Sequence, residues 1–387
     1  MSENFIPLSV PNLNGNELNY ITHAVKTEWV STGGPYIEEF EQKIAAYVNA
    51  KGAVSCQSGT SGLHIALQVC GVTELHEVIV PTLTFIAAVN PVKYLGADPV
   101  FMDCDDTLCM DPDKLKEFCE KECVFKDNKL INKITSKHIK AIVVVHVFGN
   151  LCDMEKINGI ANSYNLTVIE DATEALGSYY LNGRYKGMYA GTVGNIGVFS
   201  FNGNKIMTTG GGGMIVSNDE KLLTLSKHLT TQAKSDDLYY THDEVGYNYR
   251  MTNLQAALGL AQLEKLEEFI STKTMNFKIY LEGISQIQNL SLLQHRTDIR
   301  SNYWFYAMVV NKDYPMNRHH LIKYLAEKKI QVRPIWGLIH QQKPYINNQS
   351  YKIEKAYHYL ESVLNIPCSS NLSQKEILRV LESLDFE

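Results

Sequence analysis

One lysine of this chain, Lys205, lies in a setting that suits covalent chemistry. It follows an apolar run at residues 198–201 and a tight-turn sequence at 202–204, and four glycines follow at 210–213. The run predicts a buried strand with the lysine just past its end. Apolar, small and glycine neighbours desolvate the amine, which lowers its pKa and favours a nucleophile able to form a Schiff base. A flexible hairpin linking two strands is the alternative interpretation.

A second chemical signal lies at residues 55–62, where hydroxyl side chains and glycines precede a helical pattern that starts at Leu63. A helix that begins here brings free backbone N–H groups and its positive dipole end together with the hydroxyls of Thr60 and Ser61. This arrangement suits a phosphate group. An ordinary helix cap explains the same residues, since Ser and Thr are favoured at that position.

Strands and helices alternate from here on, with apolar, β-branched runs at residues 78–85, 141–146 and 166–171. Such runs predict a mostly parallel sheet that is covered on both faces. Ligands bind at the carboxyl ends of the strands in sheets of this kind. Five side chains are expected at or near these ends: Thr60, Phe85, His146, Asp171 and Lys205.

Each of these residues also has an ordinary structural interpretation. Asp171 could cap a following helix, and Phe85 could belong to the core. His146 fits best as a structural histidine, so we leave it out of the catalytic set. The functional interpretation depends on the convergence of the group at one edge of the sheet.

The length of 387 residues exceeds what a single core usually supports, so we expect two packed domains. A capping box, Thr252-x-x-Gln255, predicts a long helix from about Asn253. We place the boundary there, with a large domain at residues 1–252 and a linking helix and smaller domain at 253–387. Near the N-terminus, Asn14 with Glu17 predicts the start of an amphipathic helix.

A formal charge of −6 provides no basic surface for nucleic acid or anionic membranes. No apolar run reaches the roughly 18 residues of a membrane span, and the start of the chain does not resemble a signal peptide. We therefore expect a cytoplasmic protein. The eight cysteines include looser pairs, Cys104 with Cys109 and Cys119 with Cys123, that zinc could use, but we expect neither metal nor disulfide.

A phosphate cradle, an aromatic plate, a strand-end carboxylate and a Schiff-base lysine together fit pyridoxal 5′-phosphate (PLP) better than any other cofactor. The carboxylate would keep the pyridine nitrogen protonated, which makes the ring an electron sink. The lysine would hold the aldehyde and move protons.

These motifs, in this order, resemble the DegT/DnrJ/StrS-type sugar aminotransferases. The resemblance covers nearly the whole chain and rests on Ser58-Gly59-Thr60-Ser61, Glu170-Asp171-Ala172, Ser200 to Lys205, Gly246 to Met251, and Arg333-Pro334. It implies the type I PLP-dependent (aspartate aminotransferase-like) α/β fold. That fold has a mostly parallel sheet in a large domain and a smaller α+β C-terminal domain.

The resemblance also implies roles for individual residues. Lys205 matches the Schiff-base lysine, Asp171 the partner of the pyridine nitrogen, and Phe85 the aromatic ring that stacks on the cofactor. Glu174 stands where many members have a glutamine that contacts the ring hydroxyl.

The remaining carried-over residues concern the phosphate and the substrate. Thr60, Ser61 and Ser200 match phosphate contacts. Asn248 matches an asparagine that reaches the phosphate from the neighbouring subunit, which implies a homodimer with shared active sites. Arg333 and His340 are candidate contacts for the nucleotide sugar.

Glu174, together with Asn202 where many members have histidine, looks most like the branch that makes legionaminic acid precursors. This likeness implies transfer of the amino group of glutamate to C4 of a nucleotide-linked 4-keto-6-deoxy-N-acetylhexosamine, for a surface glycan. Amination at C3 of a keto sugar stays open, as does a non-catalytic PLP-fold binding or regulatory protein. The carrier, which could be UDP, GDP or dTDP, and the C4 epimer also stay open.

Overall fold

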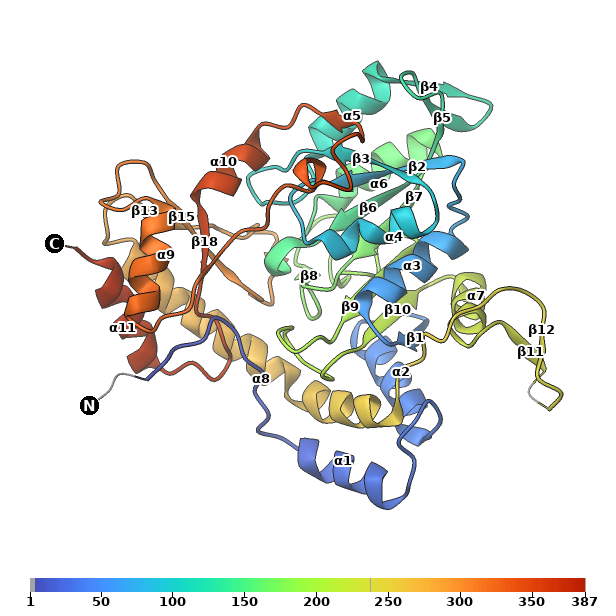
Figure 1. Cartoon of the computed structure of the whole chain (residues 1–387), viewed down its shortest axis with the longest axis horizontal. Helices are drawn as coiled ribbons and strands as arrows, with labels where there is room; N and C mark the ends of the chain where they lie inside the picture. The colour runs from blue at the N-terminus through green and yellow to red at the C-terminus, as the bar shows by residue number, and fades with distance from the viewer. Residues whose placement is uncertain (1–3, 237, 387) are drawn as a thin grey trace.

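A ten-stranded sheet forms the centre of the larger part of the molecule (Figure 1). The computed structural model describes residues 4–236 and 238–386. The main strands lie in the order β1-β10-β9-β7-β6-β2-β3-β17, with β4 and β5 attached beside β6. Their bounds are β1 Gly52–Cys56, β2 His76–Pro81, β3 Asp98–Met102, β4 Cys123–Lys126, β5 Lys129–Asn132, β6 His138–Val145, β7 Thr167–Asp171, β9 Ile196–Ser200, β10 Gly213–Ser217 and β17 Ser350–Tyr351.

The centre of this sheet is parallel, as the sequence predicts. β3, β2, β6, β7 and β9 pair in parallel, whereas β10 pairs antiparallel with both β9 and β1. The parallel strands therefore end at one edge of the sheet. β9 and β10 are joined by the loop that carries Lys205, so the lysine lies in a connection between two strands.

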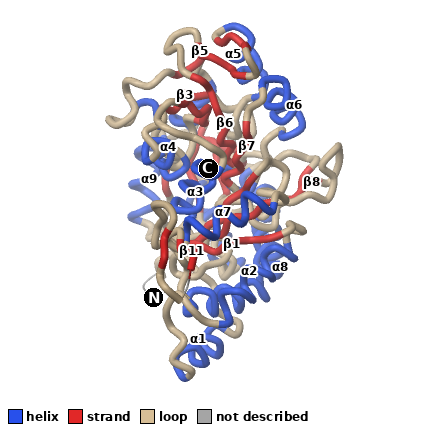
Figure 2. The backbone as a smooth tube through the Cα atoms, turned by 90° about the vertical axis from the view of Figure 1, so that its right-hand side faces the viewer, coloured by secondary structure: helices blue, strands red, loops and turns tan. Residues whose placement is uncertain are grey.

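Side chains that alternate along the strands fill two separate cores, one on each face of the sheet. In β2, Val78 and Val80 face one core and Ile79 faces the other. The first core is covered by α3 (Gly59–Val69), α4 (Asn90–Tyr94) and α7 (Glu220–Thr230). The second is covered by α2 (Pro35–Tyr47), α5 (Pro112–Lys121) and α6 (Met154–Tyr164). Figure 2 shows the strands running between helices.

The smaller unit is built on a four-stranded antiparallel sheet in the order β13-β15-β18-β16. The strands are β13 Leu290–Leu292, β15 Tyr306–Val310, β16 Arg333–Pro334 and β18 Val363–Ile366, and the helices are α9 Arg318–Glu327, α10 Lys355–Ser362 and α11 Gln374–Leu384. The long helix α8 (Asn253–Ile284) packs on α1 and α2 and also on α11, so it joins the two units (Figure 1). The predicted capping box at Thr252 and Gln255 starts it.

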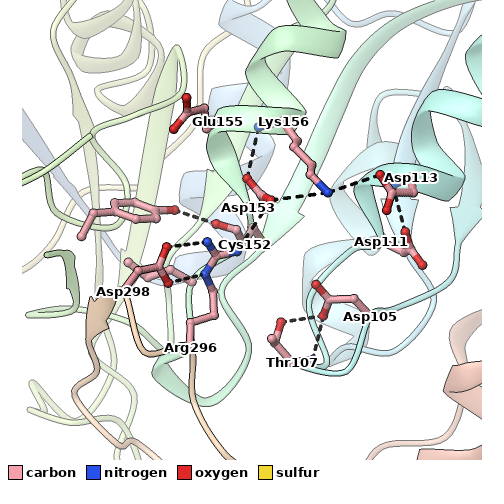
Figure 3. Close-up of polar contacts among 12 residues, drawn as sticks. Asp105, Thr107, Asp111, Asp113, Cys152, Asp153, Glu155, Lys156, Arg296 and Asp298 are labelled. Atoms are coloured by element: carbon pink, nitrogen blue, oxygen red, sulfur yellow. Dashed lines mark hydrogen bonds and ion pairs between the residues drawn. The ribbon is translucent and has the colours of Figure 1, made fainter. Parts of the chain in front are cut away.

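Short segments cross between the two units. β17 pairs with β3 of the large sheet, and Ile6 pairs with Ile330 of the smaller unit. β14 (Ile299–Arg300) pairs with β8 (Tyr179–Tyr180). Just before β14, Arg296 forms a two-point ion pair with Asp298 and approaches Asp153 at the start of α6 (Figure 3). The smaller unit is thus tied to the large one near the strand ends.

The remaining elements lie on the periphery. The N-cap residue of α1 (Glu17–Lys26) is Asn16, two positions after the predicted Asn14. The Glu17 side chain accepts hydrogen bonds from Gly15 N and from Gln262 of α8, so a tertiary contact shifts the helix start. The hairpin of β11 (Lys234–Asp236) and β12 (Thr241–His242) projects from the large unit (Figure 1), and three 3₁₀ turns are η1 Ile86–Ala88, η2 Val147–Gly149 and η3 Ile339–Gln341. Within the described residues, none of the helices has the length and apolarity to cross a membrane.

Candidate active site

A cavity of about 380 Å³ lies at the carboxyl ends of the parallel strands. Six of the ten residues predicted for the site line it: Thr60, Phe85, Asp171, Glu174, Ser200 and Lys205. They come from α3, from the segment after β2, from β7 and the segment that follows it, and from β9 and its loop. The edge of the sheet thus brings together side chains that lie up to 145 positions apart in the sequence.

Lys205 projects from the loop after β9 into this cavity, and its side chain is 12% exposed. A turn in which Lys205 N donates to Asn202 O sets the direction of the loop. The amine Nζ lies 3.9 Å from Glu174 Oε1 and 4.1 Å from the ring centre of Trp304. Within residues 4–236 and 238–386, Nζ has no hydrogen-bond acceptor in reach, so the amine is held by charge and packing alone.

Burial is the largest influence on the pKa values of Lys205 and Glu174. It lowers the pKa of the Lys205 amine, and the charges of Glu174 and Asp171 oppose this effect. Burial raises the pKa of Glu174 to about 7, against the opposing influence of Lys205 and of the Phe148 N–H, which donates to Glu174 Oε2 at 2.9 Å. The lowered pKa of the lysine and the raised pKa of the carboxyl bring their proton affinities closer together, which favours proton exchange between them.

Asp171 ends β7 with its carboxylate buried in the cavity wall. Burial raises its pKa, and hydrogen bonds from Thr173 act in the opposite direction. The helix-cap interpretation does not apply, because the described chain continues from Asp171 into turns and β8 and no helix begins there. A buried carboxylate beside one lysine matches a site for a cationic ring nitrogen.

The start of α3 lines the cavity beside the end of β9. Ser58 caps the helix, and its side chain and that of Ser61 form a capping box. A Cβ atom at Gly59 would lie 2.9 Å from Ser200 Cβ, so glycine allows the helix start to touch the end of β9. Thr60 and Ser200 therefore face the cavity beside the helix N-terminus, an arrangement that binds anions.

Phe85 follows β2 and is 54% exposed, which excludes the interpretation as a core residue. The opposite wall is aromatic and comes from the smaller unit. Trp304 and Phe305 stack with their ring centres 4.0 Å apart, and Trp336 completes the wall. The sequence predicted no role for Trp304 or Phe305. The tryptophan among aromatic neighbours at 303–306 is the only signal for them, and it is equally typical of a core strand.

His146 is buried and fully engaged. Its Nε2 lies 2.8 Å from Glu170 Oε2, and its Nδ1 accepts a hydrogen bond from Cys152 N. Glu170 in turn accepts hydrogen bonds from Gly191 N and Val193 N. His146 thus holds the segment after β6 to Glu170 of β7, in agreement with its structural interpretation.

Four predicted residues do not line the cavity. Ser61 is buried in its capping box, and Asn248 is exposed after the β11–β12 hairpin. Arg333 is exposed on β16, and the ring nitrogens of His340 contact Thr82 and Tyr357. Their assignment to phosphate or nucleotide sugar stays a prediction.

The cavity fits PLP by the chemistry of its lining. It combines a lysine of lowered pKa, a buried carboxylate for a pyridinium nitrogen, an exposed phenyl ring and a helix N-terminus with hydroxyl groups. Lys205, Asp171, Phe85 and the start of α3 are the features that would hold the aldehyde, ring nitrogen, ring face and phosphate.

Known proteins agree with this assignment. A GDP-perosamine synthase of Escherichia coli O157:H7 is 38% identical over 383 residues, which cover 98% of either chain. A UDP-4-amino-4,6-dideoxy-N-acetyl-beta-L-altrosamine transaminase of Campylobacter jejuni is 29% identical and covers 98% of this chain and 96% of its own.

Solved structures show the same fold. An aminotransferase from Psychrobacter cryohalolentis superimposes with a TM-score of 0.86 at 27% identity, with 99% of this chain and 98% of that one covered. The PLP form of a putative sugar aminotransferase from Streptococcus pneumoniae gives a TM-score of 0.87 at 24% identity, with 98% of each chain covered. The expected type I fold and PLP as its cofactor are confirmed. The profile of the DegT/DnrJ/EryC1/StrS aminotransferase family matches residues 11–385, and the chain belongs to this family.

Proposed function

We propose that the protein transfers the amino group of glutamate to C4 of a nucleotide-linked 4-keto-6-deoxy-N-acetylhexosamine, in the cytoplasm, for legionaminic acid or a related surface-glycan sugar. The observation that carries the proposal is the convergence of Lys205, Glu174 and Asp171 in one cavity of an aminotransferase. The name of the C. jejuni relative, with its 4-amino and N-acetyl groups, supports the class of sugar.

When bound, PLP supplies an electron sink that stabilises the charge left when the Cα proton of the amino acid is removed. Lys205 Nζ takes that proton and returns one to the substrate carbon, because burial keeps a fraction of the amine neutral. Asp171 would stabilise the positive charge of the ring nitrogen, and Phe85 would hold the ring face. Glu174 would bind the ring hydroxyl.

The substrate would enter beside the aromatic wall of Phe305 and Trp336, which excludes water from the lysine. Arg333 and His340 would contact the nucleotide sugar outside the cavity. Asn248 would reach the phosphate of the other subunit in a homodimer.

A second candidate substrate is the keto-sugar precursor of GDP-perosamine, because a GDP-perosamine synthase is 38% identical to this chain. The two candidates differ in the N-acetyl group of the sugar, and only the second has GDP as a fixed carrier. The aminotransferase chemistry and the residues proposed for it are the same in both.

Absorbance spectroscopy tests the proposal in two steps. A band at roughly 410–430 nm that converts to one near 330 nm when glutamate is added would report amino transfer to the cofactor. A 4-keto-6-deoxy-N-acetylhexosamine linked to UDP, GDP or dTDP should then restore the first band, and NMR of the product should place the new amine on C4. Restoration by the precursor of GDP-perosamine alone would establish the second candidate, and an amine on C3 would refute both.

A further inference from the structure

Trp304 separates the reaction cavity from a second, much smaller pocket. This rear pocket of about 10 Å³ is large enough for about one water molecule and has a mostly polar lining that includes Asn12, Gln262 and Lys273. Lys205 and Trp304 line both spaces. Trp304 is only 3% exposed. Its indole therefore forms part of the wall between the two spaces, and Lys205 lies against this wall.

Two contacts orient the indole of Trp304, and a third holds the backbone of this residue. Its Nε1–H donates to Asn204 O, the carbonyl just before Lys205, at 2.7 Å. Its ring stacks on Phe305 with an interplanar angle of 8°. Its backbone N–H donates to Asn302 Oδ1, and the Asn302 amide donates to Glu174 O at 3.0 Å. Trp304 thus connects the turn of the lysine with the segment of its neighbouring carboxyl.

The ring also faces the amine. Nζ lies 4.1 Å from the ring centre, well inside the range of a cation–π interaction, and tryptophan is the side chain that provides the strongest one. Glu174 Oε1, at 3.9 Å, lies beyond hydrogen-bond distance. An ammonium held over a ring face keeps its rotational freedom, which a directed hydrogen bond would restrict.

We propose that Trp304 is a positioning residue for Lys205: its indole holds the turn of the lysine and provides the surface on which the protonated, released amine rests. The role depends on the assignment of Lys205 as the proton-transferring amine of the proposed function. Over a full catalytic cycle the amine would be released from the cofactor once, would carry a proton in each half reaction and would rejoin the cofactor only at the end. A surface that stabilises the ammonium without fixing it serves both movements.

The charged groups around Nζ define what the ring contributes. Glu174 and Asp171 face the amine from the β7 side and favour its protonated form. Lys273, from α8, lines the rear pocket and donates to Cys368 O. Like the two carboxyl groups, the ring favours the protonated amine, whereas burial favours the neutral amine. Removal of the ring should therefore lower the pKa of Lys205.

The cofactor-free protein provides the test, because its result does not depend on amino transfer. Lys205 is acylated with acetic anhydride over a range of pH, and peptide mass spectrometry gives its rate. In Trp304→Leu we expect the apparent pKa of Lys205 to fall by about 0.5 to 1, and in Trp304→Phe, which keeps a ring, by less. Trp29→Phe, at a residue that is 55% exposed and lies outside the cavity lining, should leave this pKa unchanged.

An unchanged or raised pKa in a folded Trp304→Leu protein would overturn the proposal. A second measurement keeps the indole in place. The chain has three tryptophans, so the double variant Trp29→Phe/Trp336→Phe leaves Trp304 as the only tryptophan, which can be excited selectively over the tyrosines. Its fluorescence should titrate with the pKa of Lys205 found by acylation, and Lys205→Ala should abolish the titration. A titration that persists in Lys205→Ala would contradict the contact.

These results are separable from those of the proposed function. A pKa shift in a protein that fails to accept an amine from glutamate would leave the contact intact and refute the function. Amino transfer with no pKa shift would support the proposed function and refute the role of Trp304.

Discussion

Lys205 lies between a carboxyl group and an indole, and no hydrogen bond within the described residues fixes its amine. Replacement by alanine removes the only lysine among the described residues that line the cavity. We expect Lys205→Ala to lose amino transfer by more than about a thousandfold and to lack the long-wavelength cofactor band. Absorbance after addition of PLP measures the cofactor band, and a stopped assay with glutamate measures amino transfer. Lys221→Ala, an exposed lysine on α7, is the control and should behave as the wild type.

Glu174 makes the stability of the cofactor-free protein depend on pH. Its carboxyl has a folded-state pKa of about 7, above the ordinary value of 4.5. The folded protein therefore binds more protons than the unfolded chain between these values. The favourable contribution is fully present below pH 4.5 and is lost as the pH rises through 7.

The size of this effect corresponds to about 3 kcal/mol of unfolding free energy. Glu174→Gln removes the ionisation and keeps the shape of the side chain. We expect the variant to gain stability relative to the wild type as the pH rises from 5 to 8, measured as the difference between their melting temperatures. A difference that stays constant over this range would show that Glu174 ionises normally in the folded protein.

The contact between α3 and β9 shapes the cavity at the level of elements. Gly59 permits it, because a Cβ atom there would lie 2.9 Å from Ser200 Cβ and 3.0 Å from Thr173 Cγ2. Gly59→Ala should push the helix start outward and weaken PLP binding about 10- to 100-fold. Fluorescence titration with PLP measures this. Gly159→Ala in α6, where nothing lies within 4 Å of the added Cβ, should bind PLP normally.

The elements that carry the cofactor side of the site were predictable because their signals are local. The apolar runs of β6 and β7, the hydroxyl-rich start of α3 and the capping box of α8 all act within a few residues. The start of α1 was not predictable from Asn14, because Glu17 bonds to Gln262 about 245 positions away. Trp304 was missed for the same reason, since its partners Asn204 and Lys205 lie 100 and 99 positions before it.

At the scale of the whole molecule, both units line the cavity, and short segments of one unit pair with the other. The smaller unit contributes Trp304, Phe305 and Trp336 to the cavity, and β14 pairs with β8 of the large unit. Composition and length predicted two domains, but they contain no information on how the two units meet. The side of the site that faces the substrate therefore emerges only from the packing of the whole chain.

The β11–β12 hairpin projects from this assembly with apolar side chains in solvent. Leu238, Tyr239, Tyr240 and Val245 are 71–82% exposed, and Asn248 follows them outside the cavity. Exposed apolar groups in such numbers indicate a contact surface. Together with the expected role of Asn248, they predict a homodimer in which each hairpin reaches the other subunit's cofactor.

Mixed dimers test this arrangement directly. Lys205→Ala supplies an intact Asn248, and Asn248→Asp, which places a carboxylate beside the phosphate, supplies an intact lysine. Each variant alone should have little activity at low PLP concentration. In a twofold symmetric dimer with shared sites, half of the randomly mixed dimers are hybrids, and each hybrid holds one fully normal site, so about a quarter of wild-type activity should return. If Asn248 acted within its own chain, no hybrid would contain a normal site and mixing would restore nothing.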